Sequence, residues 1–243
     1  DVSNSMQAQD FEPSRLERTK FAIDRLTQQL EQDRIGLIVF AGDAYMQLPI
    51  TSDYVAARSF AAQISPTMVS KQGTAIGAAI DLAASSFSSG SEGSRVIVVI
   101  SDGENHEDDA LAAAKAAAEK GIRIYTIGIG TPEGAPISID GEFIKDEQGD
   151  MVVSKLDEQM LEQIALTTGG AYIRATNRSL GLDEIVQKIN EVEKKELTST
   201  VFEDFNEQYQ YLIGLALALL LLEFAMLERR SRLLARFNIF RKR

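Results

Sequence analysis

Five oxygen-bearing residues in three separate stretches of the chain could together hold a metal ion. The sequence opens with D-V-S-N-S-M, which places a carboxylate and two hydroxyls at alternate positions, Asp1, Ser3 and Ser5. Alternate positions of an extended segment face the same way, so a turn leaving a strand can aim all three at one point. Thr74 and Asp102 add a hydroxyl and a second carboxylate downstream. Such oxygen donors suit a hard cation, Mg²⁺ first, with Mn²⁺ as a ready substitute.

The opening string also has a simpler interpretation. Asp and Ser cluster in turns because their side chains hydrogen-bond the local backbone. The string alone therefore does not separate a metal site from an ordinary turn, and the two downstream pieces are what favour the metal site. A site of this kind needs a strand leading into it, and no initiator Met precedes Asp1. We therefore expect a strand upstream of Asp1.

The elements that must position these side chains alternate between helices and strands. Buried strands are predicted at 34–40, 96–100, 123–129 and 171–175, and an antiparallel edge strand at 44–48. Helices are predicted at 14–30, 53–64, 74–87, 110–120, 154–168 and 182–196. Continuous apolar strands that alternate with helices are typical of an α/β fold, doubly wound, with a mainly parallel sheet and helices on both faces. Asp102 follows the strand at 96–100, and ligands of such sheets collect at the carboxyl ends of strands.

Local signals add detail to this outline. Ser14 and Glu17 fit a capping box at the start of the first helix. In the helix at 53–64, the expected core residues are Val55, Phe60 and Ile64. Residues 136–153 contain two glycine turn signals and are predicted to form a hairpin inserted between core elements.

The charge distribution excludes some function classes. The whole chain carries −11, but residues 212–243 hold seven basic residues against two acidic ones, so residues 1–211 carry −16. A domain this acidic is a poor binder of phosphate backbones, so nucleic acid is not an expected partner. Cysteine is absent, which removes a disulfide framework and a cysteine nucleophile. No phosphate-binding loop or serine-hydrolase elbow occurs in the sequence.

The composition changes near the C-terminus. A linker at 197–210 precedes residues 211–228, in which Leu212–Leu222 is wholly apolar. Residues 211–227 as a helix would span about 26 Å, at the short end for a hydrocarbon layer of about 30 Å. This stretch predicts a transmembrane helix, with a buried core helix or a helix on the membrane surface as alternatives. The basic run at 229–243 places this tail in the cytoplasm by the positive-inside rule, and the acidic domain on the other, periplasmic side.

The three-part pattern in this structural context resembles the von Willebrand factor A domain and its metal-ion-dependent adhesion site. The resemblance covers residues 1 to about 195, and we assign the domain to 1–196. Longer strings are similar to the bacterial BatB proteins of the aerotolerance operon, which carry this domain beside membrane helices. These strings are GLIVFAGD from Gly36, GTAIGAAI from Gly73, SDGENH from Ser101 and YTIGIG from Tyr125.

The resemblance implies a role for each site residue. Ser3, Ser5 and Thr74 would offer neutral oxygens, and Asp1 and Asp102 would act largely through waters and hydrogen bonds. An ion with few direct carboxylates stays electron-poor, so an Asp or Glu of a protein partner could complete its coordination. The resemblance also suggests other von Willebrand A membrane proteins and a MoxR-type AAA ATPase as partners, in a system tied to oxidative or envelope stress.

Two function classes remain open at this point. The first is a membrane-anchored, metal-dependent protein-binding module with no catalytic residues, in the bacterial inner membrane. The second is a metal-assisted hydrolase, in which a cation and nearby carboxylates activate water. The second lacks a positioned base and a basic phosphate clamp, so the sequence favours the first. His106 stands among four acidic residues and fits an exposed loop better than a second metal position.

Overall fold

The structure is a computed structural model of the chain. It describes residues 1–30, 33–88, 93–105, 107–139, 141–177, 179–191 and 209–228. The chain divides into two compact units, Asp1–Glu191 and Val192–Arg243.

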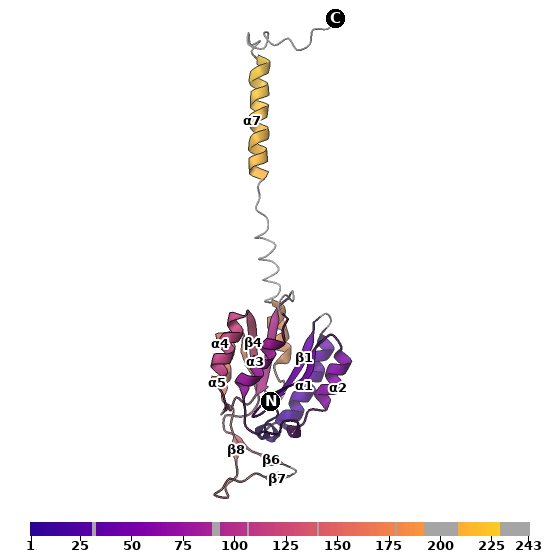
Figure 1. Cartoon of the computed structure of the whole chain (residues 1–243), viewed down its shortest axis with the longest axis vertical. Coiled ribbons are helices and arrows are strands. Elements are labelled where there is room, and N and C mark those ends of the chain that lie inside the picture. The colour runs from indigo at the N-terminus through magenta and orange to yellow at the C-terminus, as the bar shows by residue number, and fades with distance from the viewer. Residues whose placement is uncertain are drawn as a thin grey trace. The chain divides into compact units, whose positions relative to one another are not determined.

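Helices and strands alternate along the first unit (Figure 1). The helices are η1 (Asn4–Gln7), α1 (Arg15–Gln29), α2 (Tyr54–Ala62), η2 (Pro66–Met68), α3 (Ile76–Ser86), α4 (Ala110–Glu119), α5 (Glu158–Thr167) and a helix at 182–191. The strands are β1 (Ile35–Phe40), β2 (Ala44–Thr51), β3 (Arg95–Ser101), β4 (Ile122–Gly128), β5 (Ala135–Pro136), β6 (Ser138–Ile139), β7 (Glu142–Phe143), β8 (Val153–Ser154) and β9 (Tyr172–Arg174).

The longer strands form a parallel sheet and a separate antiparallel pair, and the short strands pair antiparallel as β5 with β8 and β6 with β7. Strands β3, β4 and β9 are parallel, in the order β3-β4-β9. Strands β1 and β2 pair antiparallel, as the sequence predicts for 44–48. The backbone between these two sheets is that of Asp1, whose nitrogen donates to Ile100 O at 3.2 Å, and Val2, whose nitrogen donates to Phe40 O at 2.8 Å. The first two residues therefore lie between the carboxyl ends of β1 and β3.

An apolar cavity of about 240 Å³ adjoins this position. Residues of β1, β2, β3 and α3 line it, among them Ile38, Met46, Val98 and Ala79. Because Asp1 lies between the ends of β1 and β3, a strand that leads into Asp1 would run along this cavity. That upstream strand stays a prediction.

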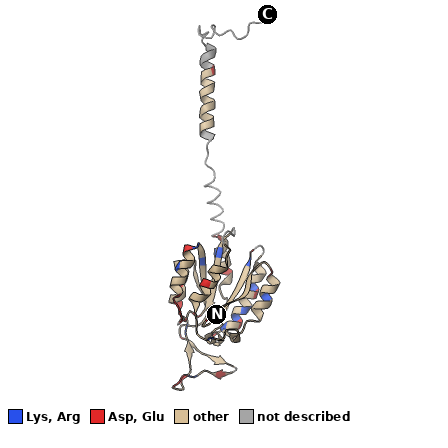
Figure 2. Cartoon of the chain, in the orientation of Figure 1, with Lys and Arg blue, Asp and Glu red and all other residues tan. Residues whose placement is uncertain are grey.

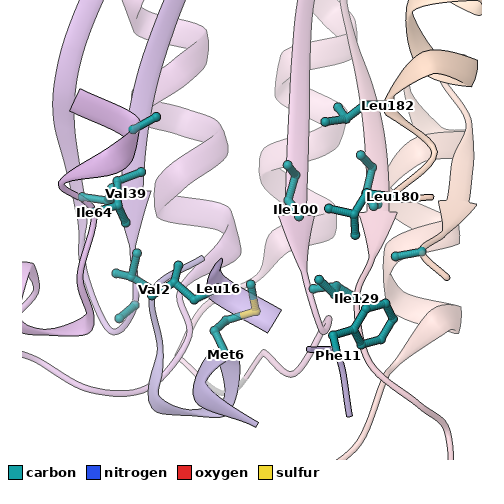
Figure 3. Packing of buried hydrophobic residues seen from close by; sticks show 14 of the residues in the cluster. Val2, Met6, Phe11, Leu16, Val39, Ile64, Ile100, Ile129, Leu180 and Leu182 are labelled. Carbon is teal, nitrogen blue, oxygen red and sulfur yellow. The ribbon is translucent and has the colours of Figure 1, made fainter. Parts of the chain in front are cut away.

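Buried side chains cover both faces of the parallel sheet, which confirms the α/β fold. Successive strand residues point to opposite faces. Accordingly Tyr125 and Ile127 belong to a cluster with α1, α2 and the helix at 182–191, whereas Ile124 belongs to a cluster with α3, α4 and α5. Figure 3 shows Val2 and Leu16 of the first cluster between the side chains of the two sheets.

The helix ends follow the predicted local signals. The Ser14 hydroxyl accepts a hydrogen bond from the Glu17 nitrogen at 3.2 Å, which confirms the cap of α1. Of the three core residues predicted for the helix at 53–64, Ile64 is buried, just beyond the end of α2, but Val55 is 69% exposed and Phe60 36% exposed, so these two predictions were wrong. The buried residues of α2 are alanines, since small side chains let this helix pack closely against α1.

The opening segment is not extended in the way the alternate spacing predicts. Asn4–Gln7 forms a turn of 3₁₀ helix, in which the Met6 nitrogen donates to Ser3 O at 3.0 Å. The turn, and not the pleat of a strand, brings the side chains of Ser3 and Ser5 together.

In the second unit, α7 (Tyr209–Glu228) forms where the sequence predicts a helix. Over the described part of the chain, however, no helix combines the length and the apolarity that crossing a membrane requires. This finding does not support the transmembrane assignment of 211–228, which stays a prediction. Leu212–Leu222 covers only about 16 Å of helix axis, and Glu223 follows it; Figure 2 shows acidic colour towards that end of α7. The linker at 197–208 and the basic tail at 229–243 lie outside the described residues.

Candidate metal centre

The three predicted stretches meet at the carboxyl ends of β1 and β3. Asp102 follows β3 directly. The backbone of Val2 bonds to the last residue of β1, and the Ala75 nitrogen donates to Ala41 O just beyond β1 at 2.7 Å. Thr74, which precedes Ala75, is therefore held beside the same strand end. Chain topology thus gathers residues that are up to a hundred positions apart.

The first stretch forms a buried cluster of oxygens. The hydroxyls of Ser3 and Ser5 lie 2.8 Å apart, and both residues are buried. The Asp1 carboxylate accepts the Ser3 nitrogen at 2.9 Å and the Ser101 hydroxyl at 2.6 Å. Its partners are thus neutral donors, and none of the Lys or Arg side chains in the described ranges pairs with it.

Asp102 is fully buried and differently held. Its Oδ2 accepts Arg15 Nη1 at 3.1 Å and the Ser154 hydroxyl at 3.1 Å, while its Oδ1 accepts the Glu104 nitrogen at 3.3 Å. Its backbone oxygen accepts the Asp157 nitrogen at 2.8 Å. One predicted site carboxylate is therefore paired with a guanidinium.

Arg15 is itself fully buried at the first turn of α1. Its Nε and Nη2 donate to the two carboxylate oxygens of Asp10, each at 2.8 Å. The remaining donors reach Asp102, the Ser154 hydroxyl at 2.8 Å and the Ser154 backbone oxygen at 3.3 Å. These contacts use all five N–H donors of the guanidinium, so the cation is completely enclosed.

Asp10 completes this network. Burial by itself would raise the pKa of Asp10, but the hydrogen bonds and charge of Arg15, together with Thr131, bring this pKa below its usual value. The Thr131 nitrogen donates to Asp10 Oδ2 at 3.0 Å. The carboxylate therefore stays ionised and keeps Arg15 in place.

The loop after Asp102 positions Thr74 through the start of α3. Asn105 accepts the Ile76 nitrogen at 3.2 Å, and the Asp108 carboxylate accepts the nitrogens of Gly77 at 3.0 Å and Ala78 at 2.7 Å. A carboxylate at a helix N-terminus satisfies its free N–H groups and interacts favourably with its dipole. Asp108 thus serves helix capping, and His106 lies outside the described residues.

Gly103 shapes the turn that follows Asp102. Its φ is +80°, and a Cβ at this position would lie 2.5 Å from Asp157 O. Glycine alone satisfies both conditions at low cost. Through this close approach, Asp102 is tied to the start of α5.

The donor set fits a hard cation that binds mainly neutral oxygens. Over the described ranges, no three His, Cys, Asp or Glu side chains gather closely enough to hold a metal ion. A site made here would therefore rely on the hydroxyls of Ser3, Ser5 and Thr74, with Asp1 and Asp102 as its two carboxylates. Each of these five is a hard oxygen donor.

Sequence reasoning missed the residues that surround Asp102. Arg15 stands directly after a helix cap, where a basic residue is normally exposed, and both Ser154 and Asp157 were predicted as caps of the helix at 154–168. Asp157 does cap α5, since it accepts the Met160 nitrogen at 3.0 Å, but Ser154 does not. The hairpin that ends in Ser154 extends from the end of the unit at which the chain begins (Figure 1). No local pattern signals contacts of this range.

Comparisons with known proteins agree with this geometry. Residues 1–190 match the von Willebrand factor type A domain. An aerotolerance-related membrane protein of Bacteroides fragilis, solved with multiple mutations to serines, is 51% identical, with a TM-score of 0.74 over 78% of this chain and 94% of that one. The conserved hypothetical protein BatB of Bacteroides thetaiotaomicron is 49% identical, with the same TM-score over 78% and 95%.

More distant relatives share less. Proximal thread matrix protein 1 of the mussel byssus, solved with a zinc-occupied MIDAS motif, is 15% identical with a TM-score of 0.54, over 77% of this chain and 44% of that one, which shows the fold alone. An uncharacterised protein of Borreliella burgdorferi is 30% identical over 92% of this chain. This chain spans 66% of the length of that relative, just under two thirds.

Proposed function

This chain belongs to the von Willebrand factor type A family, and on that basis we propose that it is a BatB-like, divalent-metal-dependent protein-binding module. The observation that carries the proposal is the cluster of half-buried Asp1 with buried Ser3 and Ser5 at the carboxyl ends of β1 and β3, with Thr74 and Asp102 held at the same strand ends. Such a cluster offers the hard oxygen donors that a divalent cation binds.

Mg²⁺ or Mn²⁺ is the proposed ion. Ser3, Ser5 and Thr74 would hold it through their hydroxyls, and Asp1 and Asp102 through waters and hydrogen bonds. When bound, the ion supplies an electrophilic position that an incoming carboxylate can fill. Ser101 keeps the Asp1 carboxylate in one orientation by donating to its Oδ2.

The proposed ligand is an Asp or Glu side chain of a partner protein. Neutral hydroxyl ligands leave most of the positive charge of the ion uncompensated. A carboxylate is therefore a favourable additional ligand, because it brings a negative charge. From the likeness to BatB alone, we further propose other von Willebrand A membrane proteins and a MoxR-type AAA ATPase as members of the same assembly, in a system that serves stress resistance or aerotolerance.

The proposed place of action is the bacterial inner membrane. The B. fragilis relative is named a membrane protein, which supports membrane association of this chain. The proposed orientation, with the domain in the periplasm and residues 229–243 in the cytoplasm, rests on the charge distribution of the sequence and on the predicted span at 211–228.

The alternative, a metal-assisted hydrolase, is less well supported. A general base must be oriented toward the water that it deprotonates. The Asp1 carboxylate is oriented by the Ser3 nitrogen and the Ser101 hydroxyl, and Asp102 is paired with Arg15. Metal-dependent protein binding, in contrast, does not require either carboxylate to accept a proton from water.

Calorimetric titration of the chain with Mg²⁺ and with Mn²⁺ tests the proposal. We expect saturable binding in the wild type and its loss in the double variant Ser3→Ala/Ser5→Ala. Ser85→Ala is the matched control, since that hydroxyl bonds only within α3. Equal binding by the double variant and the wild type would show that these hydroxyls hold no ion.

A further inference from the structure

A buried cation already occupies one side of the candidate metal centre. The Arg15 guanidinium contacts Oδ2 of Asp102 at 3.1 Å, and the side chains of both residues are 0% exposed. A buried ion pair is held more firmly than a surface pair because water does not screen it. Any metal ion near Asp102 therefore meets a fixed positive charge that shares the same carboxylate.

The charges around the site are not balanced evenly. Arg15 lies between Asp10 and Asp102, whereas the partners of Asp1 are neutral donors. The guanidinium thus offsets negative charge at Asp102, whereas no cationic side chain in the described ranges pairs with the Asp1 carboxylate. Since like charges repel at short range, this arrangement weakens the attraction of the site for a divalent cation.

We propose that Arg15 is an internal competitor of the metal ion for Asp102, which keeps metal affinity low until an acidic partner arrives. This inference rests on the proposed function and concerns the regulation of the same site. With the charge of Asp102 partly offset by the guanidinium, an ion held by hydroxyls retains most of its own charge. A partner carboxylate then contributes a large share of the binding free energy, so metal and partner bind together.

The hairpin insertion is connected to this competitor. Ser154, at the end of β8, contacts the guanidinium through both its hydroxyl and its backbone oxygen, and its hydroxyl also donates to Asp102. The strands β5 and β8 pair at the base of the insertion. A partner that displaces the insertion would move Ser154, loosen Arg15 from Asp102 and strengthen metal binding.

Charge substitutions at Arg15 test the proposal by titration of the whole chain with Mg²⁺ and Mn²⁺ alone. Arg15→Gln removes the charge but keeps a hydrogen-bond donor, and we expect its metal Kd to fall roughly tenfold below that of the wild type. Arg15→Lys keeps the charge and should bind metal within about threefold of the wild type. Arg25→Gln changes the same charge on the same helix at an exposed pair with Asp183 and should leave the affinity unchanged.

The variant Arg15→Gln is expected to be less stable than the wild type, so a second measurement compares the effect of metal on the Tm of each protein. Because a bound ion stabilises only the folded state, saturating Mn²⁺ should raise the Tm of this variant by more than it raises that of the wild type. Binding by Arg15→Gln that is equal to or weaker than wild-type binding, with no larger rise in Tm, would overturn the competitor role and leave the proposed function standing. Absence of binding in every variant and in the wild type would overturn both.

Discussion

Asp1 and Asp102 lie at the same edge of the fold, but their carboxylates are held by different partners. Asp1 accepts a backbone nitrogen and the Ser101 hydroxyl. Asp102 accepts a guanidinium, the Ser154 hydroxyl and a backbone nitrogen. The first carboxylate is therefore held by neutral donors alone, while the second is already part of an ion pair.

The different partners of Asp1 and Asp102 indicate that the two sides of the site have different roles. The segment of Asp1, Ser3 and Ser5 supplies the oxygens for an ion, and the surroundings of Asp102 supply rigidity. Arg15 connects α1 to Asp102 and to the end of the hairpin insertion through its hydrogen bonds. Gly103 brings the segment of Asp102 close to the start of α5. Substitutions on the two sides should consequently differ in whether they reduce stability or metal binding.

The largest expected effect on stability is that of Asp102→Ala. This change leaves the buried Arg15 cation without one of its two carboxylates, and breaking a buried ion pair costs about 3–5 kcal/mol. Asp1→Ala loses hydrogen bonds to neutral donors only and should cost about 1–2 kcal/mol. Urea unfolding of both variants measures the two values. Equal losses would show that the two carboxylates are held alike.

Gly103→Ala should have the next largest effect. Besides the strain of its positive φ, the new Cβ would collide with Asp157 O, and we expect a loss of about 2–3 kcal/mol. Gly149→Ala is the control, because Gly149 has a φ of +89° but nothing within 4 Å of a Cβ. It should cost about 1 kcal/mol. Thermal unfolding distinguishes the two; equal losses would mean that the contact with Asp157 is unimportant.

Ser154→Ala should have a smaller effect. It removes one hydrogen bond from Arg15 and one to Asp102 while the ion pair itself remains, so we expect a loss of about 1–2 kcal/mol. Amide exchange in residues 135–154 should become faster, since the hairpin loses its side-chain link to the site. Unchanged exchange there would show that Ser154 does not couple the hairpin to Asp102.

The smallest expected effect is the contribution of Asp10 to the pH dependence of the free energy of unfolding. The pKa of Asp10 is below its usual value in the folded chain, so its contribution is complete above that usual value and is lost as the pH falls through the lower, folded-state pKa. Asp10→Asn should remove this part of the acid dependence. Stability curves from pH 6 to pH 2 measure it, and parallel curves for variant and wild type would contradict the role of Asp10.

Local signals in the sequence were sufficient for much of the fold. Ser14 caps α1, Asp157 caps α5, and the apolar run at 96–100 forms the first strand of the parallel sheet. Each of these depends on neighbours within a few residues, so the sequence displays it directly. Helical phase was less certain, and Val55 and Phe60 proved to be exposed.

The surroundings of the site could not be predicted in the same way. The partners of Asp102 are Arg15, 87 residues away, and Ser154, 52 residues away. Their contact arises only when α1 and the hairpin reach the same strand ends. A buried arginine also leaves no pattern of its own, because arginine at the first turn of a helix is usually exposed.

Water-proton relaxation of the Mn²⁺-loaded chain tests the central claim most directly, because it reports the coordination positions that remain open to solvent. The account predicts that bound Mn²⁺ enhances relaxation, that a peptide containing Glu lowers the enhancement by displacing water, and that the same peptide with Gln does not. It also predicts no enhancement in Asp1→Ala. An enhancement that both peptides leave unchanged would contradict an open metal position that accepts a partner's carboxylate.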